Sequence, residues 1–118
     1  MQIPKDAVLL RIFLGEDDKS GHLPLYEAIV LKAREMHLAG ATVLRGAVGF
    51  GRSTRLHTTK ILRLSQDLPI VIEIVDAEDR INAFLPDLEK LMRKASSLVT
   101  LEKAKVLRYG NDAAAEGG

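Results

Sequence analysis

The sequence contains no cysteine and no tryptophan, and it has only two tyrosines and three phenylalanines. The absence of cysteine excludes disulfide bonds, thiolate nucleophiles and cysteine-based zinc sites. The scarcity of aromatic rings leaves no platform on which single-stranded bases would stack. No apolar run reaches the roughly 18 residues of a membrane span, and residues 1–6 lack the apolar core of a signal peptide. We therefore expect a cytoplasmic protein without membrane insertion.

The chain also lacks an excess of charge of either sign. It carries 17 basic and 16 acidic side chains, a formal net charge of +1. So small a charge produces no field that would hold DNA or RNA, and we expect no nucleic-acid partner. A length of 118 residues fits a single domain with its own core. We predict one domain over residues 1–110 and a disordered tail over residues 111–118, which has nothing to bury.

Catalytic motifs are absent as well. There is no Gly-x-Ser-x-Gly elbow, His-Glu-x-x-His helix, Walker loop or dinucleotide fingerprint. The three histidines, His22, His37 and His57, lie far apart, so no metal site is expected. The acidic run Glu16–Asp18 could hold a cation, but a solvated loop is the favoured interpretation. We expect a protein that is not an enzyme; the catalytic alternative pairs His57 with Glu16 or Asp17.

Hydrophobic periodicity predicts six elements. Strands are expected at residues 7–15, 41–50, 68–75 and 98–109, and helices at 24–38 and from Asp76 through Ala95. Gly40 is expected to cap the end of the first helix, and Asp76, with Asp79 three residues later, the start of the second. The order indicates an α+β, ferredoxin-like βαββαβ fold, with a four-stranded antiparallel sheet and two helices on one face.

The strands are apolar on both faces. In the first strand, Leu10 and Ile12 point to one side while Leu9 and Phe13 point to the other. Two helices can cover only one face, and an antiparallel sheet with a wet face should alternate apolar and polar residues. We infer that copies of the chain cover the second face. The alternative is that these are scattered surface residues, as every protein has.

The stretch GAVGFGRSTRLHTTK, residues 46–60, is rich in glycine, cations and hydroxyls. Gly49 and Gly51 allow backbone N–H groups to turn toward an anion. Arg52 and Arg55 could supply forked donors to a phosphate or carboxylate. An ordinary glycine turn is the alternative interpretation. The polar residues that follow suggest a loop with an ordered base and a free tip.

The segments LRIFLGEDD, PLYEAIVLKARE, GATVLRGAVGFG, LHTTKILRLSQDLPIVIEIVD and LVTLEKAKVLRY resemble a PII-like family known as domain of unknown function 190. The resemblance covers residues 9–109. It implies a ferredoxin-like subunit in a compact homotrimer, with the sheets lining its centre. PII-type trimers bind nucleotide effectors in clefts between subunits, and the effector reshapes a long T-loop that docks on a transporter, channel or enzyme.

By this resemblance, the base of the loop and one arginine of the last strand contact the ligand: Gly49, Gly51, Arg52, Ser53 and Arg108. The loop itself would bind a partner protein through Arg55, His57, Thr58 and Lys60. The chain departs from PII proteins at residues 93–98, where their second phosphate loop has glycine and this chain has none. The implied effector is an adenine nucleotide or another small anion. The alternative is a structural or docking trimer without a small ligand, like CutA.

Overall fold

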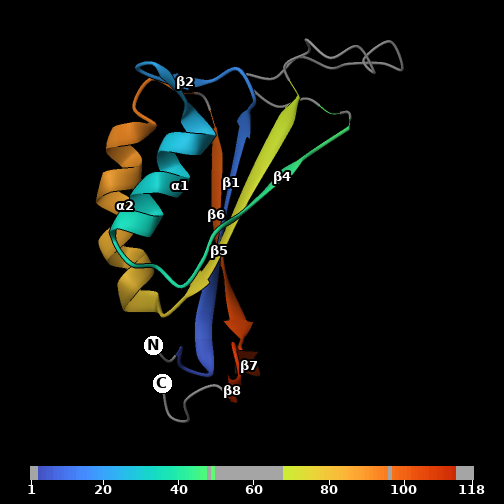
Figure 1. Ribbon diagram of the computed structural model, residues 1–118, viewed down its shortest axis with the longest axis vertical. Helices are drawn as coiled ribbons and strands as arrows, with labels where there is room; N and C mark the ends of the chain where they lie inside the picture. Colours follow the sequence, from blue (N-terminus) through green and yellow to red (C-terminus); the bar gives the residue numbers. More distant parts are fainter. Residues whose placement is uncertain (1–2, 48, 50–67, 96, 114–118) are drawn as a thin grey trace.

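The longest strand, β1 (Asp6–Gly15), lies at the centre of a four-stranded antiparallel sheet in the order β4-β5-β1-β6. The computed structural model describes residues 3–47, 49, 68–95 and 97–113. The other sheet strands are β4 (Thr42–Arg45), β5 (Pro69–Asp76) and β6 (Leu98–Lys105). Helices α1 (Leu25–Glu35) and α2 (Glu78–Leu91) cover one face of this sheet (Figure 1). This confirms the ferredoxin-like βαββαβ prediction.

The core lies between the sheet and the two helices. Alternate residues of β1 and β5 point toward the helices, and Leu10, Ile12 and Ile72 are fully buried there. The helices contribute residues at helical spacing: Leu25, Ile29 and Ala33 from α1, and Ile81, Phe84 and Leu88 from α2. Each large apolar side chain stabilises the fold by about 1.5–3 kcal/mol when it leaves water. Among the described residues, no helix is long and apolar enough to cross a membrane.

Asp76 does not cap α2 as predicted. The N-cap is Ala77, and no side chain closes this helix end. The Asp76 carboxylate is instead buried, with 1% of the residue exposed. It accepts hydrogen bonds from the Ala77 amide at 2.7 Å, the Ala39 amide at 2.9 Å and Arg80 Nε at 3.2 Å. Asp76 therefore joins the start of α2 to the connection between α1 and β4.

The end of α1 also differs from the prediction. Gly40 does not cap it: the helix stops at Glu35, and His37 takes the left-handed conformation with φ of 58°. The His37 amide donates to the Arg34 carbonyl and the Leu38 amide to the Ala33 carbonyl, each at 3.0 Å. This is the hydrogen-bond pattern of a Schellman motif. Leu38 packs against the core, which explains why the chain turns before Gly40.

Strand β4 ends at Arg45, earlier than the predicted 41–50, and Gly46 lies opposite Pro69, the first residue of β5. The Gly46 amide donates to the Pro69 carbonyl at 2.8 Å. A Cβ atom at Gly46 would lie 2.8 Å from Pro69 Cγ. That distance is shorter than non-bonded carbon atoms tolerate, so the position opposite Pro69 requires glycine.

The predicted last strand, 98–109, is divided in two. Strand β6 ends at Lys105, and a hairpin of β7 (Arg108–Tyr109) and β8 (Asp112–Ala113) follows around Gly110, whose φ is 64°. Residues 111–113, which the sequence assigns to the tail, form part of this hairpin, and residues 114–118 lie outside the described residues. A further two-residue pair, β2 (Lys19–Ser20) with β3 (Leu23–Pro24), precedes α1.

We predict that Asp76→Ala lowers the free energy of unfolding by about 3 kcal/mol, because it removes the acceptor of the Ala77 and Ala39 amides and of Arg80. Urea denaturation at a fixed protein concentration measures this loss. Asp79→Ala is the matched control. Asp79 is exposed, and it contributes about 0.3–1 kcal/mol through its position at the start of the helix. Equal losses for the two variants would contradict the assignment.

Gly46→Ala should destabilise the fold by about 1–3 kcal/mol, because the added methyl group overlaps the rigid ring of Pro69. Gly40→Ala is the control, since a Cβ atom there meets nothing within 4 Å. Its expected effect lies between neutral and a stabilisation of about 1 kcal/mol. Thermal and urea unfolding of both variants measure these changes in stability. An unchanged stability of Gly46→Ala would show that the segments around Gly46 and Pro69 can move apart at no cost.

Candidate functional site

An apolar row crosses the face of the sheet opposite the helices, which we call the open face. The strand registers align Leu44 of β4, Val71 of β5, Phe13 of β1 and Leu98 of β6. Leu44 is 49% exposed and Leu98 is 57% exposed. No helix of the described residues covers this face (Figure 1). Four large side chains thus form a continuous apolar row across every strand of the sheet, and we keep the name apolar row for them.

A polar row lies beside the apolar row. It consists of Thr42, Glu73, Arg11 and Thr100, aligned across the same four strands. Arg11 Nε donates to Glu73 Oε2 at 2.9 Å, and Arg11 also forms an ion pair with Glu102 of β6. The hydrogen bond to Glu73, reinforced by the charge of Glu102, raises the pKa of Arg11 above its ordinary value. One cation therefore faces two carboxylates, which leaves this cluster with a charge of −1.

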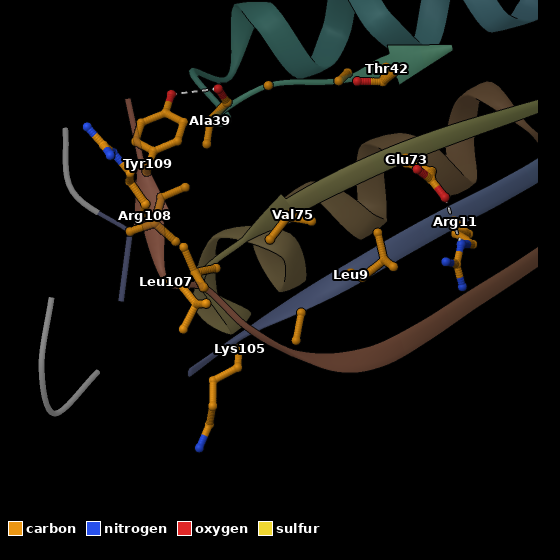
Figure 2. A pocket seen from close by; sticks show the side chains of 15 residues that line it. Leu9, Arg11, Ala39, Thr42, Glu73, Val75, Lys105, Leu107, Arg108 and Tyr109 are labelled. Carbon is orange, nitrogen blue, oxygen red and sulfur yellow. Dashed lines mark hydrogen bonds and ion pairs between the residues drawn. The ribbon is translucent and has the colours of Figure 1, made fainter. Parts of the chain in front are cut away.

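A cleft of about 640 Å³ adjoins the polar row at the end of the sheet where β1 begins. Leu9, Val75 and Leu107 give it apolar walls, and residues 39–41, between α1 and β4, form one side. In Figure 2 the cationic heads of Lys105 and Arg108 lie at the edge of the cleft, away from Leu9 and Val75. Apolar walls with cations at the rim suit a molecule that has a flat apolar part and an anionic part.

One contact joins the β7–β8 hairpin to the side of this cleft, and a second lies within the hairpin. Tyr109 Oη donates to the Ala39 carbonyl oxygen at 2.7 Å, across the cleft from one segment to the other (Figure 2). Arg108 Nε donates to the Gly110 carbonyl oxygen at 3.3 Å within the hairpin. The remaining nitrogens of this exposed guanidinium can serve an anion.

Of the ligand residues that the sequence predicted, the structure describes Gly49 and Arg108. A Cβ atom at Gly49 would lie 3.3 Å from Pro69 Cγ, so Gly49 lies beside the end of the sheet where Gly15 pairs with Pro69. Arg108 follows β6 at the other end, where Lys105 pairs with Asp6 (Figure 1). The ten-residue strand β1 between these ends spans about 30 Å. One chain therefore does not bring Gly49 and Arg108 together.

The other predicted residues lie outside the described residues. These are Gly51, Arg52 and Ser53 at the base of the loop, and Arg55, His57, Thr58 and Lys60 in the loop. Their roles remain predictions. The catalytic alternative that involves His57 is likewise untested.

The acidic run Glu16–Asp18 forms local contacts. The Glu16 carboxylate forms an ion pair with Arg45 at the end of β4. The Glu16 amide donates to the Leu68 carbonyl at 2.8 Å. Asp18 Oδ2 accepts the Gly15 amide at 2.9 Å and closes the turn after β1. Within the described ranges, no three histidine, cysteine, aspartate or glutamate side chains gather as metal ligands would. The run thus ends β1 and orients the chain before α1.

Sequence reasoning missed Tyr109, Glu73 and the cleft itself. A signal existed for Glu73. It stands between Val71 and Val75 on one face of an apolar strand. Arg11 stands in the same way between Leu9 and Phe13 on another strand. Opposite charges at equivalent alternation on two strands indicate a cross-strand ion pair. Tyr109 offered no such signal, because its partner is a backbone carbonyl 70 residues away.

The chain is similar in sequence to one family of proteins. Residues 7–106 match the model of the DUF190 family, described as "Uncharacterized ACR". A UPF0166 protein of Aquifex aeolicus is 38% identical over 99 residues, which cover 84% of this chain and 91% of that protein. A UPF0166 protein of Methanocaldococcus jannaschii is 34% identical over 93 residues, which cover 79% of this chain and 85% of that protein.

Solved structures share the fold at lower identity. CPII, a PII-like protein of Thiomonas intermedia bound to ADP and bicarbonate, superposes with a TM-score of 0.64 and 18% identity, covering 87% of this chain and 90% of that one. A Thermus thermophilus protein described as PII-like superposes with a TM-score of 0.63 and 17% identity, covering 90% of this chain and 93% of that one. CutA of Synechococcus elongatus superposes with a TM-score of 0.56 and 8% identity, covering 87% of this chain and 80% of that one. The chain belongs to the DUF190 family, and its fold is the PII-like form of the ferredoxin-like fold.

Proposed function

We propose that this chain is a PII-like signalling subunit that regulates a partner protein, without a catalytic step of its own. It assembles as a homotrimer and binds a small anionic effector, foremost an adenine nucleotide, in the cleft between neighbouring chains. The observation that carries this proposal is the separation of the two segments that the sequence predicts to bind the ligand. Gly49 and Arg108 lie at opposite ends of the sheet, about 30 Å apart along β1. A ligand that contacts both must lie between two chains.

Self-association is supported by the apolar row. Leu44, Val71, Phe13 and Leu98 form a contiguous apolar surface, exposed at Leu44 and Leu98 and partly exposed at Val71 and Phe13. Such surfaces on small proteins mark interfaces. Covering this surface with a second copy removes it from water, and closed symmetry lets every copy do so equally. The trimer in particular rests on the resemblance to PII proteins.

Effector binding is supported by the chemistry of the cleft. Its apolar walls from Leu9 and Val75 suit a flat base, and Arg108 and Lys105 at the rim suit a phosphate. A neighbouring chain would complete the site with the loop base, Gly49, Gly51, Arg52 and Ser53. CPII, which shares the fold, is bound to ADP and bicarbonate. An adenine nucleotide is therefore the first class of ligand to test.

The regulatory step in this proposal is a shift between conformations of the loop. A ligand changes that equilibrium only by its differential affinity for the two states. Contacts from the effector to Arg52 and Ser53 would supply this difference. Arg55, His57, Thr58 and Lys60 would then meet the partner, a membrane transporter or channel or an enzyme, from the cytoplasmic side.

A second candidate is a docking trimer without a small ligand. Two observations favour it: Arg108 Nε is already bonded to the Gly110 carbonyl, and its guanidinium lies at the cleft edge, away from Leu9 and Val75 (Figure 2). Under this alternative, loss of Arg52 and Arg55 weakens only the binding of a protein partner. Under the proposed function, the same loss also weakens the binding of a nucleotide.

Isothermal titration of the protein with AMP, ADP and ATP tests the effector site. We expect heat with at least one of them, and Arg108→Ala should weaken that binding by about tenfold or more, since it removes a charge-assisted hydrogen bond. The control is Arg34→Ala, which removes an exposed arginine of α1 outside this cleft. No heat with any of the three nucleotides at millimolar concentration would exclude an adenine nucleotide as effector and favour the docking trimer.

Sedimentation velocity tests the open face. The wild-type protein should sediment as an assembly larger than its 13.0 kDa chain. Phe13→Glu places a charge in the centre of the apolar row and should dissociate the assembly to single chains. Leu31→Glu is the matched control, because Leu31 is 48% exposed on α1, away from that face. A wild-type protein that sediments as a single chain at micromolar concentration would refute the intersubunit site.

A further inference from the structure

Both backbone groups of Ala39 are bound by side chains. Its amide donates to Asp76 Oδ2 at 2.9 Å, and its carbonyl oxygen accepts Tyr109 Oη at 2.7 Å. Ala39 belongs to the short connection between α1 and β4 that forms one side of the cleft. The same connection, residues 39–41, also borders a second cleft of about 550 Å³ beside α1. We call residues 39–41 the cleft wall.

The cleft wall is anchored to the core from the side of Asp76. That residue is 1% exposed, and the carboxylate oxygen that accepts the Ala39 amide also accepts Arg80 Nε at 3.2 Å. The Arg80 guanidinium in turn donates to the His37 carbonyl, just before the wall. A buried charged acceptor with several donors holds the wall in one position.

The hairpin that carries Arg108 has little structure of its own. Strands β7 and β8 contain two residues each, and a two-stranded hairpin of any length is marginal in water. The hydrogen bond from Tyr109 joins this hairpin to the anchored wall. Arg108 and Tyr109 are consecutive strand residues, so fixing the ring of one also fixes the direction of the other.

We propose that Tyr109 is a positioning residue for the effector site: its hydroxyl ties the β7–β8 hairpin to the cleft wall and holds Arg108 at the rim. This inference rests on the proposed function for the identity of the ligand, and on the Tyr109–Ala39–Asp76 contacts for its geometry. The hydroxyl group restricts where Arg108 can meet an anion, so a bound phosphate costs less ordering of the hairpin. Removal of the hydroxyl alone should weaken binding although Arg108 is intact.

The test is a double-mutant cycle with ADP as the probe. Tyr109→Phe keeps the ring and removes the hydroxyl, and we expect ADP to bind about 3- to 10-fold more weakly. In the Arg108→Ala background the same substitution should change the affinity by less than about twofold, since there is no arginine left to position. Tyr26→Phe is the matched control: it removes the hydroxyl of the chain's other tyrosine, which is on α1 and does not line this cleft.

Hydrogen exchange of the ligand-free protein provides the second measurement. Tyr109→Phe should speed exchange in a peptide covering residues 106–113, and Tyr26→Phe should leave it unchanged. Equal ADP affinity of the wild type and Tyr109→Phe would overturn the positioning role. The role would also be overturned if Tyr109→Phe lowered the ADP affinity equally in the wild-type and Arg108→Ala backgrounds. A wild-type protein that does not bind ADP refutes the role at this ligand, and unchanged exchange in Tyr109→Phe refutes the tie to the wall.

Discussion

The constraint on which this structure depends is the two-residue alternation of its central strands. Because successive side chains point to opposite faces, β1 and β5 present Leu10, Ile12 and Ile72 to the helices and Leu9, Phe13 and Val71 to the other side. Two helices cover one face only. The chain therefore folds around a complete core and still exposes an apolar row across the whole sheet. The same alternation that builds the core of the chain also creates this apolar row.

The antiparallel order of the sheet also determines where the predicted ligand residues lie. Antiparallel pairing sends the connection after β4 to the end of the sheet near Pro69 and the hairpin after β6 to the end near Asp6. The glycine turn and Arg108 follow these strands and so occupy opposite ends. In the function proposed above, each end supplies half of a site, and association of chains would bring halves of different chains together. Assembly and effector binding would then be one property.

The sequence was sufficient for the elements and their order, because apolar alternation and helical spacing extend over eight residues or more in the central strands and both helices. It was insufficient where a few backbone hydrogen bonds decide. Gly40 was the expected cap, yet packing of Leu38 on the core places the left-handed residue at His37. Asp76 was the expected cap of α2, yet burial directs its carboxylate to the Ala39 amide. Such contacts join segments that are distant in sequence, and no local pattern encodes them.

The order of rows along the open face limits how copies can associate. The apolar row loses nothing by burial. The polar row carries the Arg11–Glu73 pair with Glu102 beside it, and ionised groups are costly to remove from water. The polar row adjoins the cleft, where Arg11, Thr42 and Glu73 form part of the lining. An assembly that buries the apolar row and leaves the polar row at the cleft avoids that cost. The residues unsuited to a subunit interface then lie where a polar ligand and water can reach them.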